Sequence, residues 1–266
     1  MNTQRFAQRA VIVTGASSGL GVAIARAFAA EGAAIVLAAR NADRLRQVAA
    51  GFSGEILAVP CDVSKRADVD NLITQTLARF GRLDILVNNA GAGMVAPVEF
   101  VEMRDAETLF ETNFFGAFHC IQAALPHLKQ QRRAHIVNVA SISGLRAIPN
   151  IAIYSAAKAA LVALSDSLRI ELRGTGVGVT AVCPGRITDT AFFEQLTRYG
   201  PLKLYEGHQV VTPDAVAQAI LEGVLKRRRL VILPSDARLL YRVNRFAPRL
   251  VDNILHKKMP KLEKSH

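Results

Sequence analysis

Cysteine is scarce in this chain, and the few cysteines show no pattern of pairing or metal binding. Cys61, Cys120 and Cys183 lie far apart, none belongs to a Cys-x-x-Cys motif, and the six histidines show no ligand spacing with them. We therefore expect buried, reduced thiols and no structural metal.

Long apolar runs are also missing, although half of the 266 residues are apolar. No run reaches the ~18 to 20 residues that a membrane-spanning helix needs. Only about nine residues precede the first expected strand, which leaves no room for a secretory signal. There are no internal repeats or low-complexity linkers. We expect a cytoplasmic protein with one large core.

Acidic residues are outnumbered, but the imbalance is local. The chain has 33 Lys/Arg and 22 Asp/Glu, a formal charge of +11, and residues 226–266 alone hold 12 Lys/Arg against three acids, or +9. The other 225 residues carry only +2. A charge of +11 spread evenly would suggest nucleic acid or an anionic surface as a partner. Here the basic character belongs to a C-terminal appendage rather than to the fold.

Short apolar runs alternate with longer helical patterns along the chain. This alternation favours a doubly wound α/β fold in which parallel strands are buried on both faces. Strands are expected at 10–14, 34–38, 56–59, 83–87, 135–139, 177–182 and 230–233, and helices at 19–31, 43–50, 66–80, 105–128, 153–173 and 213–226.

A glycine-rich turn joins the first expected strand to the first expected helix. Gly15, Gly19 and Gly21 would let the backbone turn tightly and approach a pyrophosphate, which the helix N-terminus would hold. Alone the pattern is weak, because the same spacing also serves simple packing of a helix on a strand.

Tyr154 and Lys158 lie four residues apart in an expected helix, and so share one face. A neighbouring ammonium lowers the pKa of a phenol, which makes the pair a tunable acid and base. Ser141 follows an expected buried strand, where its hydroxyl could meet the tyrosine. The alternative is a chance spacing in an ordinary helix, with the lysine solvated.

Several motifs occur together, in order and in register. They are Thr14-Gly-Ala-Ser-Ser-Gly-Leu-Gly21, Asn88-Asn89-Ala90-Gly91, Asn113, Ser141, Tyr154-x-x-x-Lys158 and Pro184-Gly185. Across about residues 8–190 the chain resembles the classical short-chain dehydrogenase/reductase family. The resemblance implies a Rossmann-type sheet of about seven strands in one domain, 1–234. The basic segment 235–266 lies beyond these motifs, and we expect it to form a C-terminal helical extension.

The resemblance also implies catalytic roles. Ser141 would bind the substrate oxygen, Tyr154 would give or take its proton, and Lys158 would lower the tyrosine pKa and bind the nicotinamide ribose. Asn113 would hold a water that connects the lysine to solvent. Ser143 is a nearby alternative hydroxyl. The competing class is a nucleotide-binding redox sensor or regulatory protein without turnover, which would need no acid and base pair.

Cofactor-binding roles follow from the same resemblance. They fall on Gly15, Ser17, Ser18, Gly19, Leu20, Gly21, Arg40, Asp62, Val63, Asn89, Ala90, Gly91, Tyr154, Lys158, Pro184, Gly185, Ile187 and Thr188. One position departs from the family pattern, because Asp189 stands where a threonine is usual, so Thr188 or Thr190 would contact the nicotinamide instead.

The end of the second expected strand reads Ala38-Ala39-Arg40-Asn41, without the acid that usually binds the ribose of NAD. Arg40, with Ser17 alongside, could instead bind a 2′-phosphate through its planar fork of donors. We therefore favour NADP over NAD. The alternative is that Arg40 is only the solvated start of a loop.

Substrate recognition is expected in the apolar, aromatic segment 186–211, as a lid over a hydrophobic alcohol or ketone. The same residues could serve ordinary packing or a homodimer or homotetramer contact. They include Phe192, Phe193, Leu196, Tyr199, Leu202, Leu204 and Tyr205, and further pocket-wall candidates are Met94, Leu145, Arg146 and Ile151.

The C-terminal extension combines cations with apolar residues at helical spacing from Leu239 to Leu255, and Pro248 should divide it into two short helices. One interpretation is packing on the protein's own body or on a sister subunit. Another is contact of residues 236–266 with an anionic membrane surface. Nucleic acid is not expected as a partner, because the apolar stripe has no use on a phosphate backbone.

Overall fold

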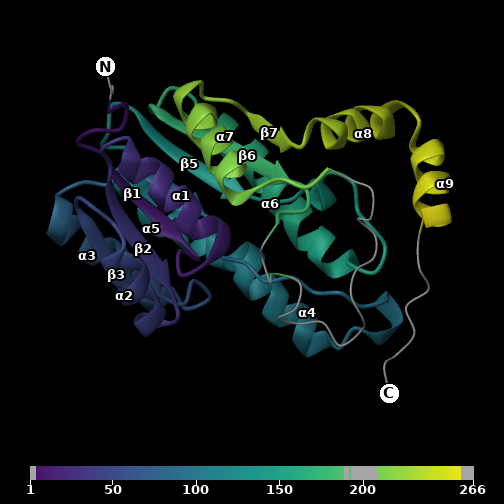
Figure 1. The fold of residues 1–266 in the computed structure, drawn as a ribbon, viewed down its shortest axis with the longest axis horizontal. Helices are drawn as coiled ribbons and strands as arrows, with labels where there is room; N and C mark the ends of the chain where they lie inside the picture. The colour runs from purple at the N-terminus through teal and green to yellow at the C-terminus, as the bar shows by residue number, and fades with distance from the viewer. Residues whose placement is uncertain (1–3, 189–191, 193–208, 259–266) are drawn as a thin grey trace.

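The structure, a computed structural model, describes residues 4–188, 192 and 209–258. Its centre is one sheet of seven parallel strands in the order β3-β2-β1-β4-β5-β6-β7 (Figure 1). The strands are β1 Ala10–Thr14, β2 Ala34–Ala39, β3 Ile56–Pro60, β4 Ile85–Asn88, β5 Ala134–Val139, β6 Val177–Pro184 and β7 Leu230–Leu233. This order confirms the doubly wound fold, with a reversal between β1 and β4.

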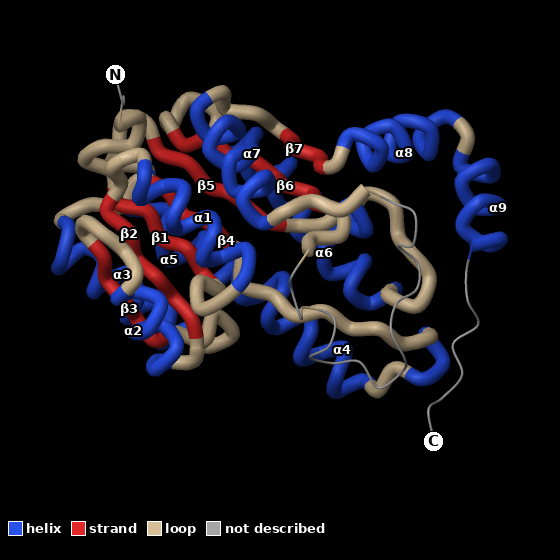
Figure 2. Tube along the Cα trace, in the orientation of Figure 1, coloured by secondary structure: helices blue, strands red, loops and turns tan. Residues whose placement is uncertain are grey.

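Helices connect successive strands and cover the sheet (Figure 2). They are α1 Gly19–Ala30, α2 Ala42–Ala50, α3 Arg66–Phe80, α4 Met103–Phe110, α5 Gly116–Leu128, α6 Ala152–Glu171, α7 Pro213–Leu225, α8 Ser235–Phe246 and α9 Pro248–Lys258, with the shorter turns η1 Val98–Phe100, η2 Glu111–Phe115 and η3 Ile142–Gly144. Local sequence signals determine where several of these helices begin or end. Asn41 caps α2 by accepting from the Arg44 amide, and α3 ends at Gly81, whose φ is 69°.

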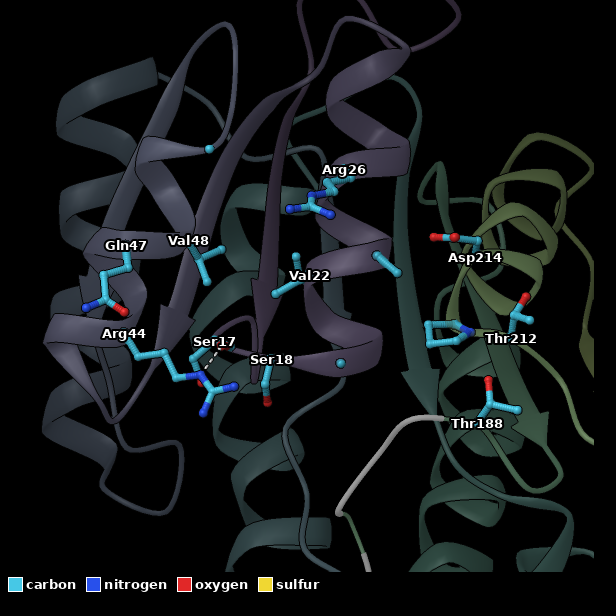
Figure 3. Close-up of a pocket in the computed structure, with 14 residues that line it drawn as sticks. Ser17, Ser18, Val22, Arg26, Arg44, Gln47, Val48, Thr188, Thr212 and Asp214 are labelled. Atoms are coloured by element: carbon cyan, nitrogen blue, oxygen red, sulfur yellow. Dashed lines mark hydrogen bonds between the residues drawn. The ribbon is translucent and has the colours of Figure 1, made fainter.

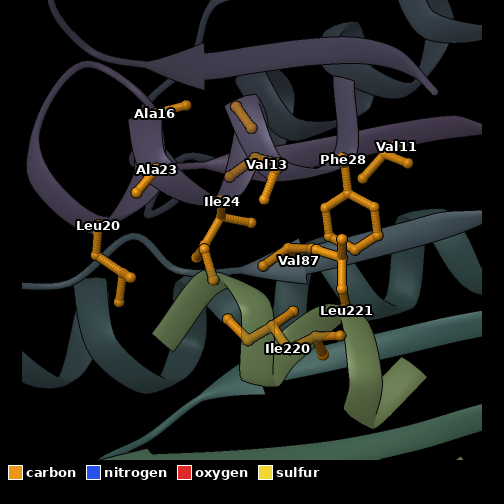
Figure 4. Packing of buried hydrophobic residues seen from close by; sticks show 14 of the residues in the cluster. Val11, Val13, Ala16, Leu20, Ala23, Ile24, Phe28, Val87, Ile220 and Leu221 are labelled. Carbon is orange, nitrogen blue, oxygen red and sulfur yellow. The ribbon is translucent and has the colours of Figure 1, made fainter. Parts of the chain in front are cut away.

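Alternate residues of one strand serve two cores, because successive side chains of a strand point to opposite faces. Val11 and Val13 pack into a cluster with α1 and α7 residues such as Ile24 and Ile220 (Figure 4). Ile12 belongs to a second cluster, with α3, α5 and α6 residues such as Leu72. Helices therefore lie on both faces, and every residue of β1 is buried.

The expected helix at 105–128 is the main local difference. The helical path runs from 103 to 128, but residues 111–115 form a turn of π-helix between α4 and α5. Such turns accommodate one extra residue in a helix and are frequent at functional sites. Asn113 lies at the middle of this turn. The fourth strand is also shifted, since β4 begins at Ile85 instead of residue 83.

The C-terminal segment forms two helices divided at Pro248, as expected: α8 ends at Phe246 and α9 begins at Pro248. We call α8 and α9 together the C-terminal arm. The arm follows β7 and reaches beyond the edge of the sheet, and α9 turns sharply away from α8 (Figure 1). Within the described part of the chain, no helix combines the length and the apolarity that a membrane span requires. The three cysteines are buried and unpaired.

Candidate active site

The glycine-rich turn lies where the strand order reverses, at the carboxyl ends of β1 and β4. Gly15 has φ of +66°, and a Cβ atom there would lie 2.8 Å from the Cα of Ala90. Gly21 packs against the Gly15 carbonyl so closely that it too has no room for a side chain. The turn leads directly into the N-terminus of α1 at Gly19. Bare backbone at a helix N-terminus in such a crevice fits a nucleotide pyrophosphate.

Thr14 fastens this turn to the end of β4. Its Oγ1 accepts hydrogen bonds from the backbone amides of Asn89 and Ala90, both at 3.0 Å, and the Asn89 side chain donates to the Thr14 carbonyl at 2.9 Å. Thr14 was not predicted from the sequence as a positioning residue. A polar residue closing an otherwise apolar strand was the available signal.

A groove with a volume of about 660 Å³ opens beside the turn, between α1, α2 and the start of α7 (Figure 3). Ser17, Ser18, Gly19 and Thr188 contribute to its lining. So does Arg44, whose Nε donates to the Ser17 carbonyl at 2.9 Å.

Arg40, which the sequence favoured as the phosphate-binding residue, is exposed and does not line this groove. Arg44 was not predicted from the sequence. It lies in the first turn of α2, whereas Arg40 precedes that helix, so no helical spacing links the two arginines.

Several expected cofactor residues serve the framework around the site. Asp62 accepts hydrogen bonds from the Ser64 amide and hydroxyl, and Val63 packs against Gly116 of α5. Leu20 is buried in α1, next to the glycine-rich turn. At the end of β6, Pro184 pairs with Leu233, the Gly185 amide donates to the Leu233 carbonyl at 2.6 Å, and Ile187 bridges to Val211.

Ser141 follows the carboxyl end of β5, and its hydroxyl oxygen accepts two hydrogen bonds from Ser143. The Ser143 amide donates at 3.2 Å and the Ser143 hydroxyl at 2.8 Å. The two bonds hold the Ser141 hydroxyl while leaving its own hydrogen available. Ser143 is 1% exposed and Ser141 8%. Of the two serines, Ser141 is therefore better placed to reach a substrate.

Tyr154 and Lys158 lie in the first two turns of α6, next to this serine loop. The Lys158 Nζ is 5.9 Å from the centre of the Tyr154 ring and donates to the Val139 carbonyl at 2.9 Å. Burial lowers the pKa of Lys158 to about 8, partly opposed by the nearby Cys183 thiol. A buried ammonium that can lose its proton near neutral pH is suited to proton transfer.

Asn113 reaches the same place from the π-helical turn. Its amide nitrogen donates to the carbonyls of Ala92 and Leu109, at 2.9 and 3.0 Å, and its oxygen accepts from the Ala92 amide at 3.3 Å. A Cβ atom on Gly91 would lie 2.6 Å from the Asn113 Oδ1 and 3.4 Å from the Lys158 Nζ. Gly91 therefore allows Asn113 and Lys158 to come close together.

A buried chain of hydrogen bonds holds α6 against the sheet. Asn88 of β4 donates to the Asn138 side chain at 2.8 Å, Asn138 of β5 donates to the Ser165 hydroxyl at 2.8 Å, and Ser165 bonds the Leu161 carbonyl. The asparagines were expected to tie adjacent strands together, whereas Ser165 was not predicted. This chain sets how α6 packs on the sheet, and with it the positions of Tyr154 and Lys158.

Apolar side chains surround Tyr154. Its ring meets the Phe192 ring edge to face, with centroids 5.8 Å apart, and Met94 and Ile151 belong to the same cluster. Leu145 lies in a different cluster, and Arg146 pairs with Asp252. Further residues expected to matter lie outside the described residues: Asp189, Thr190, Phe193, Leu196, Tyr199, Leu202, Leu204 and Tyr205.

The comparisons with known proteins agree with this geometry. The family model described as short chain dehydrogenase matches residues 9–199. The chain belongs to the short-chain dehydrogenase/reductase family and is an oxidoreductase of that family.

Two curated relatives illustrate the match. The chain is 37% identical over 215 residues to an uncharacterized oxidoreductase of Staphylococcus epidermidis, covering 81% of this chain and 92% of the relative. It is 33% identical over 257 residues to the ketoacyl reductase HetN of Nostoc, covering 92% of this chain and 88% of the relative.

Solved structures are similar over most of their length. A 3-ketoacyl-(acyl-carrier-protein) reductase of Brucella melitensis, complexed with NADH, superposes with a TM-score of 0.78 at 30% identity, covering 85% of this chain and 97% of that one. A short-chain dehydrogenase of Streptomyces avermitilis gives a TM-score of 0.82 at 30% identity, covering 94% and 96%.

Proposed function

We propose that this protein is an NADP-dependent oxidoreductase that interconverts a hydrophobic alcohol and the corresponding ketone, with Tyr154 as the acid and base. The observation that carries the proposal is the convergence of the Ser141 hydroxyl, Tyr154 and the buried Lys158 at one edge of the sheet, beside a glycine-rich turn with room for a nucleotide. A redox sensor without turnover would need the turn but not these three groups.

The roles of the three groups follow from their chemistry. In the reducing direction, Ser141 donates to the carbonyl oxygen of the substrate, and the Tyr154 hydroxyl gives that oxygen its proton as the C–O bond becomes single. The Lys158 ammonium stabilises the phenolate that remains. The nicotinamide, when bound, supplies the hydride to the carbonyl carbon and accepts it in the reverse direction.

The preference for NADP rests on charge at the end of β2. Residues 38 and 39 are both alanine, so no carboxylate stands there to bind a ribose hydroxyl or repel a phosphate. Arg40 is exposed at the end of the strand, and the Arg44 guanidinium is tied to the Ser17 carbonyl beside the turn. The Arg44 guanidinium next to Ser17, with the second guanidinium of Arg40 at the end of β2, suits a 2′-phosphate. The Brucella neighbour was solved with NADH, so the preference needs a direct test.

The hydrophobic substrate is proposed from the surroundings of Tyr154. Met94, Ile151 and Phe192 form an apolar wall around the phenol ring, which favours a carbonyl flanked by hydrocarbon. HetN and the Brucella enzyme are described as reductases of ketoacyl groups, which are ketones on a carbon chain.

A turnover screen of the purified protein tests the proposal. Aliphatic and aromatic ketones and aldehydes of increasing chain length are offered with NADPH and, separately, with NADH, and oxidation of the cofactor is followed by absorbance. We expect turnover of the more apolar ketones, faster with NADPH. Tight NADPH binding without turnover of any member would favour the sensor. Faster turnover with NADH would reject the cofactor preference while leaving the catalytic roles intact.

A further inference from the structure

The C-terminal arm is attached to the body of the protein next to the catalytic serine loop. Ala237 and Tyr241 of α8 join a cluster that contains Ile142 and Leu145, the residues just after Ser141 and Ser143. Val251 of α9 is fully buried. An ion pair between Arg146 and Asp252 completes the attachment. The arm is therefore a packed element whose position is fixed relative to the active site.

The opposite face of α8 is exposed and mixes large apolar residues with arginines. Leu239 and Phe246 are 63% and 85% exposed, and Arg242 and Arg245 are exposed on the same side of the helix. The spacing from 238 and 239 through 242 to 245 and 246 corresponds to one helical face.

The exposed face of α9 has the same composition. Leu250 and Ile254, four residues apart, are 53% and 40% exposed, and the cations Arg249 and Lys257 are exposed beside them. Four large apolar side chains therefore face outward on the two helices of the arm. The surface of a soluble protein rarely concentrates large apolar side chains in this way unless they contact a partner.

The charge of the arm decides which partner fits. Residues 235–258 contain six Lys/Arg and two acids, Asp236 and Asp252, and Asp252 already pairs with Arg146. A second copy docked symmetrically through this face would place like charges against each other. A nucleic acid would satisfy the cations but offers nothing to the apolar side chains. An anionic bilayer satisfies both, because leucine and phenylalanine enter the acyl region while arginine stays with the head groups.

We propose that the exposed faces of α8 and α9 form a docking surface for an anionic lipid bilayer. The packed face of α8, with Tyr241, and the Arg146–Asp252 ion pair join this surface to the serine loop of the active site through the arm itself. Binding depends on apolar insertion and on electrostatic attraction together, so removal of either one weakens it.

The absence of tryptophan from the chain allows a clean experiment. Phe246→Trp puts a single indole on the exposed face of α8, and Ile170→Trp puts one on α6, at a site that is 74% exposed. Vesicles of phosphatidylcholine, with and without phosphatidylserine, are titrated into each variant of the full chain. We expect a blue shift and quenching by brominated lipid for the arm indole with anionic vesicles at low salt, and neither for the α6 indole.

Two further variants, made in the Phe246→Trp protein and in the wild type, separate the two contributions. Replacing Arg242, Arg245 and Arg249 by glutamine should weaken binding to anionic vesicles roughly 100-fold, because each basic residue near such a surface contributes a factor of about five. Replacing Leu239, Leu250 and Ile254 by serine should weaken it at least tenfold, by about 1.4 kcal/mol or more. Changing Arg104, Arg132 and Arg173 to glutamine removes the same charge elsewhere and should have little effect.

Three outcomes would overturn the proposal. One is the absence of binding to anionic vesicles at low salt, where electrostatic attraction is strongest. Another is binding that the serine variant retains in full, which would mean adsorption by charge alone. The third is a smaller oligomer for the serine variant in sedimentation, with no difference in vesicle binding, which would make the arm a subunit interface.

Discussion

The two ends of strand β5 each hold a buried base, and only one of these bases lies in the candidate active site. At the amino end, burial and the nearby Arg227 and Arg133 lower the pKa of His135 to about 3. Past the carboxyl end, Lys158 bonds the Val139 carbonyl, and burial lowers its pKa to about 8. The two pKa values fall chiefly for the same reason, so a shifted pKa alone does not identify a functional residue.

Their partners distinguish the two bases. The Thr180 hydroxyl donates to the Arg228 carbonyl at 2.6 Å, so it accepts from the His135 Nε2 at 2.8 Å, and this bond holds the buried, neutral imidazole within the core. Lys158 instead faces the Tyr154 ring and the space that Gly91 leaves open. In parallel sheets ligands bind at the carboxyl edge. The comparison teaches that the position of a base on the sheet, together with open space beside it, marks it as functional.

The largest expected effect is at the carboxyl edge, on Tyr154. Tyr154→Phe removes the proton that the hydroxyl exchanges while keeping the ring against Phe192, so turnover should fall roughly 10²- to 10⁴-fold. Cofactor affinity, measured by the fluorescence of bound NADPH, should stay close to that of the wild type. Near-normal turnover would remove Tyr154 from the mechanism.

Lys158→Met should lower turnover by roughly 10- to 10²-fold, because the charge that favours the phenolate is lost. The variant also tests the buried charge itself. Between pH 8 and 10.5, the unfolded chain still holds the lysine proton that the folded chain has released, so wild-type stability should rise with pH. Urea unfolding across this window should show no such rise in the methionine variant. If stability rose equally in the wild type and in the methionine variant, a residue other than Lys158 would be responsible for the rise.

A third prediction concerns the cofactor side of the same edge. Arg40→Ala and Arg44→Ala should each lower kcat/KM for NADPH by roughly 10-fold or more, with little change for NADH, because a charge-assisted bond to the 2′-phosphate is lost. Adding Ala39→Asp to Arg40→Ala should reduce use of NADPH further, since a carboxylate repels a phosphate. Arg26→Ala, also beside the groove, is a matched control. If kcat/KM fell equally with both cofactors, neither arginine would bind the 2′-phosphate specifically.

The smallest effect on turnover is expected at the amino edge. His135→Gln keeps a donor for Thr180 but does not titrate, so activity should be unchanged. The substitution should instead change how the stability of the protein depends on pH in the acid range. Between pH 6.5 and about 3 the unfolded chain binds a proton that folded His135 does not, so wild-type stability should fall by up to roughly 1.4 kcal/mol per pH unit from this residue. A flatter acid profile for the glutamine variant would confirm this, and lost activity at neutral pH would contradict the comparison.

The sequence predicted the elements that carry strong local signals. Buried strands such as β1 are continuous apolar runs, Pro248 ends a helix by its covalent structure, and the glycines of the first turn indicate close backbone approach. Tyr154 and Lys158 were predicted as a pair because four residues make one helical turn.

Interactions between distant segments were harder to predict. Ser165 takes its importance from Asn138 on another element, and Arg44 from the carbonyl of Ser17, and neither pairing leaves a periodic trace in the sequence. The π-helical turn at Asn113 was also missed, because apolar periodicity hardly changes when one residue is added to a long helix.

That turn has a consequence for chain length. Because η2 holds one residue more than an α-helical path would need, deleting a single residue between 108 and 115 would let α4 and α5 join as one regular helix. Because the extra residue is absorbed within the turn, the deletion would leave the Leu109 side and the Cys120 side in nearly the same relative orientation. It would therefore remove the local widening that carries Asn113 while sparing the packing of the helices on either side.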